Sequence, residues 1–398
     1  MIGIFTFFIP SSVSTGAWIN DLLYLLLLDP LFPKPSAVTA NFYLCLFVFG
    51  LAFFSAQWII PQAIQFAHRF QLMDHPDFRK KHSKSTPILG GISIFVSVIF
   101  ALAFSSLFLH NYPNTYLSFE VAFGLCSAIS LMVFFGLKDD ILESSPLEKV
   151  IFQIITALIV ITSCGIRIDN FDGLFGIHEL PLIFSYVFSV FVFIIVVNAF
   201  NLIDGIDGLA ASVGLIGTLC FGLFFFLNDL VIQAVIMFCY SGALISFLIF
   251  NFKKRLFLGD NGSMSLGVVI AFGVVSVITA TNGANFVHES GYFINNASVI
   301  VLALISFPLL DTIRVFCIRI AKGKSPFRPD RNHLHHHLTN LKLSHLESTL
   351  LVVVYTIIIT VIALALSSWD ITNHFFTMLF LSSFIYLITW LSKKRLNT

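Results

Sequence analysis

Aspartates at the ends of apolar segments are the residues whose types and spacing could do chemistry in this chain. They are Asp139, Asp140, Asp204, Asp207 and Asp260. Like charges brought together at the edge of an apolar region raise the free energy unless a cation joins them. Carboxylate oxygens, with the amide oxygen of Asn201, are hard ligands of the kind that bind Mg²⁺ together with substrate phosphates. The pattern predicts a magnesium site, and capping of a helix or solvation of a loop is the alternative for each aspartate.

Glycine stands beside aspartate in two of these segments. They read Asp204-Gly-Ile-Asp-Gly208 and Gly259-Asp-Asn-Gly-Ser263, and each precedes an apolar stretch. Glycine lets the backbone approach a phosphate closely, and a helix N-terminus presents free N–H groups to an anion. Two turns with Asp and Ser as helix N-caps would give the same pattern. Both interpretations can hold at once.

A further polar segment combines basic residues with a run of histidines. Its members are Lys322, Lys324, Arg328, Arg331, His333, His335, His336 and His337. Arg and His donors suit a diphosphate, bidentately from Arg and directionally from His. A zinc site is one alternative, although the neighbouring segments offer no cysteine. A basic surface beside a membrane is another.

The elements that must position these residues are apolar. Of the 398 residues, 57% are hydrophobic and 11% are charged, and the mean hydropathy is +0.93. Because soluble domains carry about 25% charged residues, the composition excludes a soluble globular protein, a disordered chain and a nucleic-acid-binding protein. A net charge of +1 gives no overall field for a polyanion. The six cysteines form no CxxC pair, so neither a disulfide framework nor a cysteine metal site is expected.

Eleven apolar runs are long enough to cross a bilayer core, which needs roughly 20 helical residues. They cover approximately 41–66, 87–109, 117–137, 147–165, 181–200, 208–227, 230–251, 263–281, 297–320, 348–368 and 372–391. The predicted fold is an all-α polytopic integral membrane protein with one transmembrane domain over 41–395. Residues 1–40 lack the basic start of a signal peptide, and prolines interrupt their Leu-rich stretch, so an external or interfacial extension is expected.

The distribution of Lys and Arg predicts which side each loop faces. With the N-terminus outside and eleven spans, only Lys34 and Arg167 of the 22 basic residues lie on the outer side. The C-terminus is then cytoplasmic, and the polar segments described above all lie at the inner face. A reaction there with a soluble substrate is expected. Asp311 and Arg314, near the inner end of the ninth run, are either an ion pair within one helix or a substrate contact.

Six motifs follow one another through residues 41–395. They are Arg79-Lys80-x-His82, Pro87-x-x-Gly90-Gly91, Gly136-Leu-Lys-Asp-Asp140, Asn198-Ala-Phe-Asn-Leu-Ile-Asp-Gly-Ile-Asp-Gly-Leu-Ala210, Gly259-Asp-Asn-Gly-Ser263 and Pro329-Asp-Arg-Asn-His-Leu-His-His-His337. Together they resemble the polyprenyl-phosphate N-acetylhexosamine-1-phosphate transferases. The histidine motif resembles the undecaprenyl-phosphate GlcNAc-1-phosphate branch more than the phospho-MurNAc-pentapeptide branch of peptidoglycan synthesis. Glu143, where many relatives have Asp or Asn, and residues 1–40 depart from the family pattern.

The resemblance implies transfer of N-acetylhexosamine-1-phosphate from a UDP-sugar to undecaprenyl phosphate, with release of UMP. It implies Mg²⁺, or Mn²⁺ as a substitute, bound by Asp260 and Asn201. Asp139 would act as a base or position the lipid phosphate, with Asp140 as its partner. The other positions that the motifs carry over are Asp204 and Asp207 at the nucleotide and metal site, His333, His335 and Arg331 at the diphosphate, and Lys80, His82, Asn198 and His336 at the substrates.

The expected partners are a UDP-N-acetylhexosamine, a polyprenyl phosphate and the bacterial inner membrane, without nucleic acid, and a homodimer is left open. The compact basic segment from Lys322 to His337 offers no evident surface for a pentapeptide, which favours a GlcNAc-type donor. A phospho-MurNAc-pentapeptide transferase, a transporter of polyprenyl-linked sugars and an inactive scaffold are the alternatives. A transporter should show internal repeats and polar residues near the midplane of the membrane, and neither is evident in the sequence.

Overall fold

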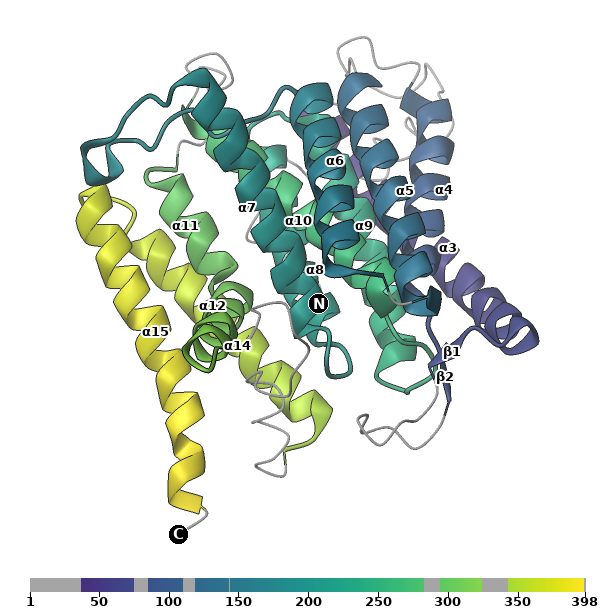
Figure 1. The fold of residues 1–398 in the computed structure, drawn as a ribbon. Helices are drawn as coiled ribbons and strands as arrows, with labels where there is room; N and C mark the ends of the chain where they lie inside the picture. Colours follow the sequence, from purple (N-terminus) through teal and green to yellow (C-terminus); the bar gives the residue numbers. More distant parts are fainter. Residues whose placement is uncertain are drawn as a thin grey trace, which may run out of the picture.

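The computed structural model describes residues 37–74, 85–109, 119–142, 144–282, 294–323 and 343–396, which form a helical bundle with one short hairpin (Figure 1). The helices are α3 (Ala37–Phe70), α4 (Gly90–Leu109), α5 (Phe119–Leu142), α6 (Pro146–Cys164), α7 (Leu182–Ile203), α8 (Leu209–Leu227), α9 (Val231–Asn251), α10 (Gly259–Asn282), α11 (Ala297–Leu304), α12 (Ser306–Ala321), α14 (His345–Ala365) and α15 (Ile371–Leu396). The hairpin pairs β1 (Met73–Asp74) with β2 (Thr86–Pro87) in antiparallel fashion, and η1 (Leu174–Gly176) is a short 3-10 turn. Of the predicted N-terminal extension, residues 1–36 lie outside the described residues, and residues 37–40 form the start of α3.

Each of the eleven predicted apolar runs contains a described helix, and the ninth contains two. Helices α3, α5, α6, α7, α8, α9, α10 and α14 are each long and apolar enough to span a bilayer, and α11 with α12 makes one further candidate. Helices α4 and α15 carry shorter apolar stretches, Gly90–Ser105 and Ile371–Leu387. A multi-pass membrane protein that is mostly helical is therefore confirmed, with the short β1–β2 hairpin as a departure from the all-α prediction. The count of eleven spans and the orientation of the termini stay predictions.

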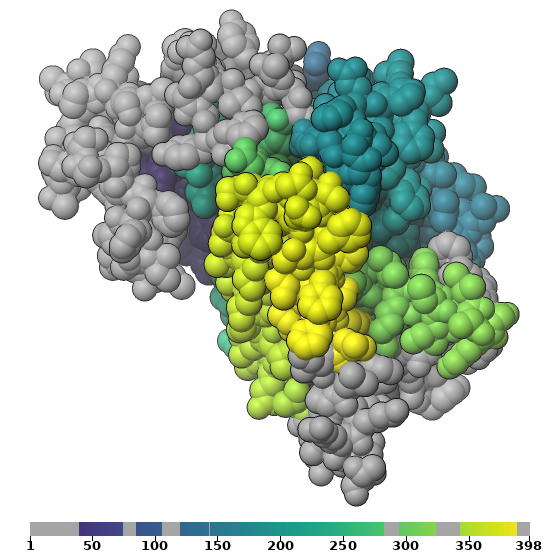
Figure 2. All heavy atoms as spheres, turned by 90° about the vertical axis from the view of Figure 1, so that its left-hand side faces the viewer, coloured from purple at the N-terminus to yellow at the C-terminus, as the bar shows by residue number. Residues whose placement is uncertain are grey.

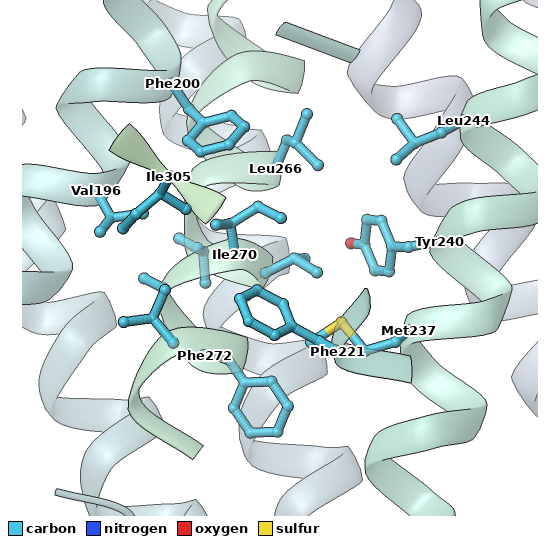
Figure 3. Packing of buried hydrophobic residues seen from close by; sticks show 14 of the residues in the cluster. Val196, Phe200, Phe221, Met237, Tyr240, Leu244, Leu266, Ile270, Phe272 and Ile305 are labelled. Carbon is cyan, nitrogen blue, oxygen red and sulfur yellow. The ribbon is translucent and has the colours of Figure 1, made fainter. Parts of the chain in front are cut away.

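Helix α10 lies at the centre of the bundle. In its apolar window 89% of the residues are buried, and it packs against α4, α5, α7 and α8. Figure 3 shows Leu266, Ile270 and Phe272 of α10 among apolar side chains of the neighbouring helices. At its start the packing is close enough to require glycine, because a Cβ on Gly136 of α5 would lie 2.4 Å from Asn261 Cα. Small residues let membrane helices approach in this way.

Two helices begin at residues that the sequence marks clearly. Ser145 caps α6 and Ser344 caps α14, each in a capping box whose partner is the glutamate three residues later. In each box the serine side chain accepts the glutamate N–H, and the glutamate carboxylate accepts the serine N–H. These caps fix where two helices start beside the polar end of the bundle.

The ninth predicted run is two helices rather than one. Helices α11 and α12 meet at an angle of 70°. The break falls at Ile305, whose φ of −101° and ψ of 13° are not helical, and Pro308 follows in the first turn of α12. Proline has no N–H and its ring clashes with the carbonyl four residues earlier, so a continuous helix through this point would be strained.

Helix α12 is joined to α15 by a buried polar cluster. Tyr386 OH donates a hydrogen bond to Asp311 Oδ1 at 2.7 Å. Arg314 Nη2 lies 3.3 Å from the same oxygen, and Arg314 Nε donates to Tyr386 OH at 2.9 Å. Buried charges require partners of this kind. The geometry favours an ion pair between Asp311 and Arg314 within one helix, with Tyr386 as a partner from a second helix.

The N-terminal end of α15 packs against the loop between α6 and α7. The ring of Phe175 in η1 lies 5.5 Å from the Phe375 ring and 5.9 Å from the Phe376 ring, between centroids. Figure 2 shows this face of the molecule, with the yellow C-terminal helices beside the teal segment of the chain. The aromatic contacts hold the C-terminal helix pair to the rest of the bundle at the end opposite the polar motifs.

Candidate active site

Two predicted site carboxylates from different helices meet around one lysine. Asp139 lies in the last turn of α5 and Asp260 in the first turn of α10, and the ammonium of Lys149 in α6 forms ion pairs with both. Lys149 Nζ lies 3.4 Å from Asp260 Oδ2. The side chain of Asp139 is 4% exposed and that of Asp260 is 34% exposed. Because like charges this close need a cation, the lysine neutralises part of the acidic cluster.

Lys149 was not predicted as a site residue. Its position follows from the capping box at Ser145, because the fourth helical residue of α6 then faces the end of α5. The neighbouring Lys138 lies elsewhere, with its Nζ 3.3 Å from Glu148 Oε1. The sequence contains the cap, but it gives no sign that α6 lies beside both α5 and α10. That information comes only from the packing.

Asp140 caps the N-terminus of α10. Its Oδ1 accepts the Asp260 N–H at 2.9 Å, and its Oδ2 accepts the Asn261 N–H at 3.1 Å. Asn261 Nδ2 also donates to Asp140 Oδ2, at 2.7 Å. A carboxylate at a helix N-terminus satisfies free N–H groups and is stabilised by the helix dipole. Asp140 therefore fixes the backbone of Asp260 and so orients the Asp260 carboxylate.

Asn201 and Asp260, the two predicted metal ligands, are in direct contact. Asn201 Nδ2 donates to Asp260 Oδ1 and to Ser263 Oγ, each at 2.9 Å. Over the described residues, no group of three His, Cys, Asp or Glu side chains could hold a metal ion by itself. An incomplete set of hard oxygen donors fits Mg²⁺, which usually keeps waters and binds through one or two carboxylates plus substrate phosphates.

Asp204 lies in the loop between α7 and α8, next to the same carboxylates. Burial raises the pKa of Asp204 well above its usual range, and the nearby negative charges, led by that of Asp260, raise this pKa further. The loop therefore places the Asp204 carboxyl group within electrostatic reach of Asp260 and Asp140. A cation bound among these groups would favour the ionised form of Asp204.

Asp207, in the same loop, is bound by the first turn of α14. His345 Nδ1 lies 2.7 Å from Asp207 Oδ2, and Thr349 Oγ1 donates to the Asp207 carbonyl at 3.1 Å. The Asp207 side chain is buried. The prediction included Asp207 and missed His345. The capping box at Ser344 places His345 at the start of a helix, but no sequence signal pairs that helix with the loop.

Asn198 makes contacts within the bundle. Its Nδ2 donates to Gln153 Oε1 at 2.8 Å, and Gln153 Nε2 donates back to Asn198 Oδ1 at 3.2 Å. This reciprocal amide pair joins α7 to α6 one helical turn before Asn201. The described hydrogen bonds of the Asn198 side chain are thus with α6 and with its own helix, and its assignment to substrate binding stays a prediction.

Six predicted site residues lie outside the described residues. They are Lys80, His82, Arg331, His333, His335 and His336. Their assigned contacts with the substrates and the diphosphate stay predictions. The structure brings together the other predicted residues, apart from Asn198, at one end of the bundle where α5, α7, α10 and α14 meet.

The part of the chain that carries these carboxylates matches a known family. Residues 122–280, which run from α5 through α10, match the family described as Glycosyl transferase family 4. The match contains Asp139, Asn201 and Asp260, whose side chains meet in the structure. The segment that forms the carboxylate cluster is therefore similar to this family.

Similar curated proteins cover most of the chain. The undecaprenyl-phosphate alpha-N-acetylglucosaminyl 1-phosphate transferase of Yersinia pestis is 29% identical over 297 residues, which are 73% of this chain and 74% of that protein. The protein of the same name from Escherichia coli (strain K12) is 27% identical over 276 residues, 68% of this chain and 70% of that protein. A decaprenyl-phosphate N-acetylglucosaminephosphotransferase of Mycolicibacterium smegmatis is 28% identical over 324 residues, 78% of each chain. The resemblance predicted from the motifs is confirmed.

Proposed function

We propose that this protein transfers N-acetylglucosamine-1-phosphate from UDP-N-acetylglucosamine to undecaprenyl phosphate. The observation that carries the proposal is the meeting of Asp139 and Asp260 at the Lys149 ammonium, with the Asn201 amide hydrogen-bonded to Asp260. Such a cluster suits a substrate that brings phosphates and a divalent ion. The names of the similar proteins support the same acceptor and the same sugar.

The reaction joins two phosphates. An oxygen of the lipid phosphate attacks the phosphorus that carries the sugar, a new phosphoanhydride bond forms, and the bond from that phosphorus to UMP breaks. UMP leaves with the electron pair of the broken bond. Charge neutralisation and in-line positioning dominate such a transfer. A phosphate monoester is largely ionised near neutral pH, since its second pKa is about 6, so a strong base is not required.

The protein residues have distinct tasks in this proposal. Asp260 and Asn201 would hold Mg²⁺, or Mn²⁺ in its place, which would neutralise the donor diphosphate. Asp139, buried beside Lys149, positions the acceptor phosphate or accepts its remaining proton. Asp140 fixes the start of α10 and thereby the direction of the Asp260 side chain. The loop from Asp204 to Asp207 borders the nucleotide.

The active site is proposed to face the cytoplasm from a bacterial inner membrane. Support comes from the basic residues, since only Lys34 and Arg167 of 22 lie on the outer side of the predicted topology. The nucleotide sugar would then enter from the cytoplasm, and the lipid acceptor would enter from the inner leaflet. The donor is proposed to be a UDP-sugar. The GlcNAc-1-phosphate branch and the phospho-MurNAc-pentapeptide branch, which the motifs resemble, both use such a donor.

A direct assay tests the proposed reaction. Purified protein is incubated with undecaprenyl phosphate, Mg²⁺ and UDP-GlcNAc labelled in the sugar, and both lipid-linked label and UMP are measured. Equal amounts of the two products are expected. Transport of a polyprenyl-linked sugar would release no UMP, and a preference for UDP-MurNAc-pentapeptide at equal concentration would overturn the choice of sugar.

A further inference from the structure

An open groove lies beside the inner end of α3, apart from the carboxylate cluster. Its volume is about 470 Å³, and it is bounded by α3, β2 and the turn that follows α9. Pro61, Ile64 and Phe250 form apolar walls, and His68, Lys254 and Arg255 add polar and basic groups. In Figure 1 the β1–β2 hairpin marks this corner of the bundle. None of these six residues belongs to the proposed active site.

The basic groups of the groove have no acidic partner within the described part of the chain. No ion pair there involves Lys254 or Arg255, whereas Lys149 at the carboxylate cluster has two. The side chains of His68, Lys254 and Arg255 are all exposed. The groove therefore presents uncompensated positive charge, which attracts an anion.

The turn that carries the two cations is held in place. The Lys254 N–H donates to the Asn251 carbonyl at 2.7 Å, and the Arg255 N–H donates to the Phe250 carbonyl at 3.1 Å. Asn251 Nδ2 donates to the Leu256 carbonyl at 2.8 Å. The next residue, Phe257, donates its N–H to the Pro87 carbonyl of β2 at 2.8 Å. These bonds fix the backbone of the turn and join it to β2, so the side chains of Lys254 and Arg255 start from a defined place beside the groove.

One face of α3 continues from the groove toward the middle of the helix. Phe54, Trp58, Pro61, Gln65 and His68 recur at intervals of three and four residues, so they share that face. Phe54 is 70% exposed and Trp58 is 71% exposed. The face is thus apolar along the span and polar at its end, which matches the change from acyl chain to headgroup in a lipid leaflet.

We propose that this groove binds an anionic phospholipid, with the headgroup phosphate at Lys254 and Arg255 and an acyl chain along Trp58 and Phe54. Basic pockets between membrane helices bind anionic headgroups. A zwitterionic lipid carries its own cation beside its phosphate, so it gains less from the uncompensated charge. The site is distinct from the acceptor site and does not depend on the proposed transfer reaction.

Native mass spectrometry of the delipidated protein tests this proposal. The protein is titrated with phosphatidylglycerol, and separately with phosphatidylcholine, and the occupancy of the first bound lipid is measured. Lys254→Ala and Arg255→Ala are each expected to weaken phosphatidylglycerol binding at least about fivefold, a loss typical of one charge-assisted hydrogen bond. Lys253→Ala is the matched control, since Lys253 is an exposed neighbour outside the groove lining and should bind as the wild type does. Arg255→Lys keeps the charge and should retain most of the binding.

Several outcomes would overturn the proposal. Equal losses for Lys253→Ala and Lys254→Ala would mean a general surface charge, and equal binding of phosphatidylcholine would remove the charge selectivity. Competition by inorganic phosphate at the same concentration would indicate a free-phosphate site instead of a lipid site. Displacement by undecaprenyl phosphate at equal concentration would assign the groove to the acceptor. Each variant is compared by its thermal unfolding midpoint, so a loss of fold is recognised separately.

Discussion

His345 Nδ1 lies 2.7 Å from Asp207 Oδ2, although 138 residues separate the two in sequence. The bond joins the loop after α7, which carries two of the predicted site aspartates, to the first residue of α14. Thr349, one turn further along α14, adds a second contact with the same loop. The start of α14 therefore determines where the Asp207 carboxylate points.

His345→Ala is expected to lower kcat/KM for the UDP-sugar by about tenfold, because a hydrogen bond to a charged group contributes about 1.5–3 kcal/mol and this pair is partly exposed. The loss should appear mainly in the KM of the UDP-sugar, since the loop is proposed to border the nucleotide. Steady-state kinetics with varied UDP-GlcNAc measure it. His345→Asn offers an amide donor at a similar position and should restore part of the loss. His178→Ala, an exposed histidine at the other end of the bundle, is the control, and an equal effect there would contradict the prediction.

Asp139→Asn and Asp260→Asn should each reduce turnover by about two orders of magnitude or more, as expected for the loss of a positioning carboxylate or a metal ligand. Amide side chains of equal size keep the packing, so expression and the unfolding midpoint should change little. Turnover at saturating substrates is the measurement. Asp229→Asn, an exposed aspartate in the turn after α8, serves as the control. Near-normal turnover in both site variants would move the mechanism to Asp204 and Asp207.

Lys149→Met should change how the protein responds to Mg²⁺. The ammonium of Lys149 pairs with Asp139 and Asp260, so its removal leaves adjacent carboxylates without a cation. In EDTA the variant should unfold at a lower temperature than the wild type. Added Mg²⁺ should then stabilise the variant more than the wild type, because ligand binding to the folded state raises its stability.

Thermal unfolding with and without Mg²⁺ measures this difference. Lys138→Met is the matched control, since Lys138 is paired with Glu148 outside the cluster. An equal Mg²⁺ shift in wild type and Lys149→Met would show that the lysine and the ion do not share the same carboxylates.

Asp140→Ala should affect stability as well as activity. Removal of the cap leaves the Asp260 and Asn261 N–H groups without their acceptor, and loss of an N-cap costs about 0.5–2 kcal/mol. Denaturant unfolding should therefore show a larger loss for Asp140→Ala than for Asp139→Asn. The reverse order would mean that Asp140 acts on the substrate rather than on α10.

Much of the fold could be predicted from the sequence, because the apolar runs are long and separated by polar segments. The break at Ile305 could not, since hydropathy does not report backbone angles and Pro308 can stand in the first turn of a helix. The partner of Asp311 also escaped prediction. Tyr386 lies 75 residues away, and no periodic pattern links the two.

The site shows the same division. Carboxylates at helix ends are visible in the sequence because charges beside apolar runs are unusual. Nothing in the sequence singles out Lys149 and His345, because their roles depend on which helices are neighbours. Gln153 was missed for the same reason, since its amide pair with Asn198 exists only when α6 packs against α7.

The orientation of the bundle can be tested with two described positions at its opposite ends. Lys253 is exposed in the turn after α9, at the same end of the bundle as the carboxylate cluster, and His178 is exposed in the loop between α6 and α7. In a background without native cysteines, of which Cys220 and Cys317 are exposed, each is replaced by cysteine. An impermeant thiol reagent should label His178→Cys in intact cells and Lys253→Cys only after lysis, because short loops rich in Lys and Arg stay in the cytoplasm. Labelling of Lys253→Cys in intact cells would invert the topology and place the carboxylate cluster on the side that holds no nucleotide sugars.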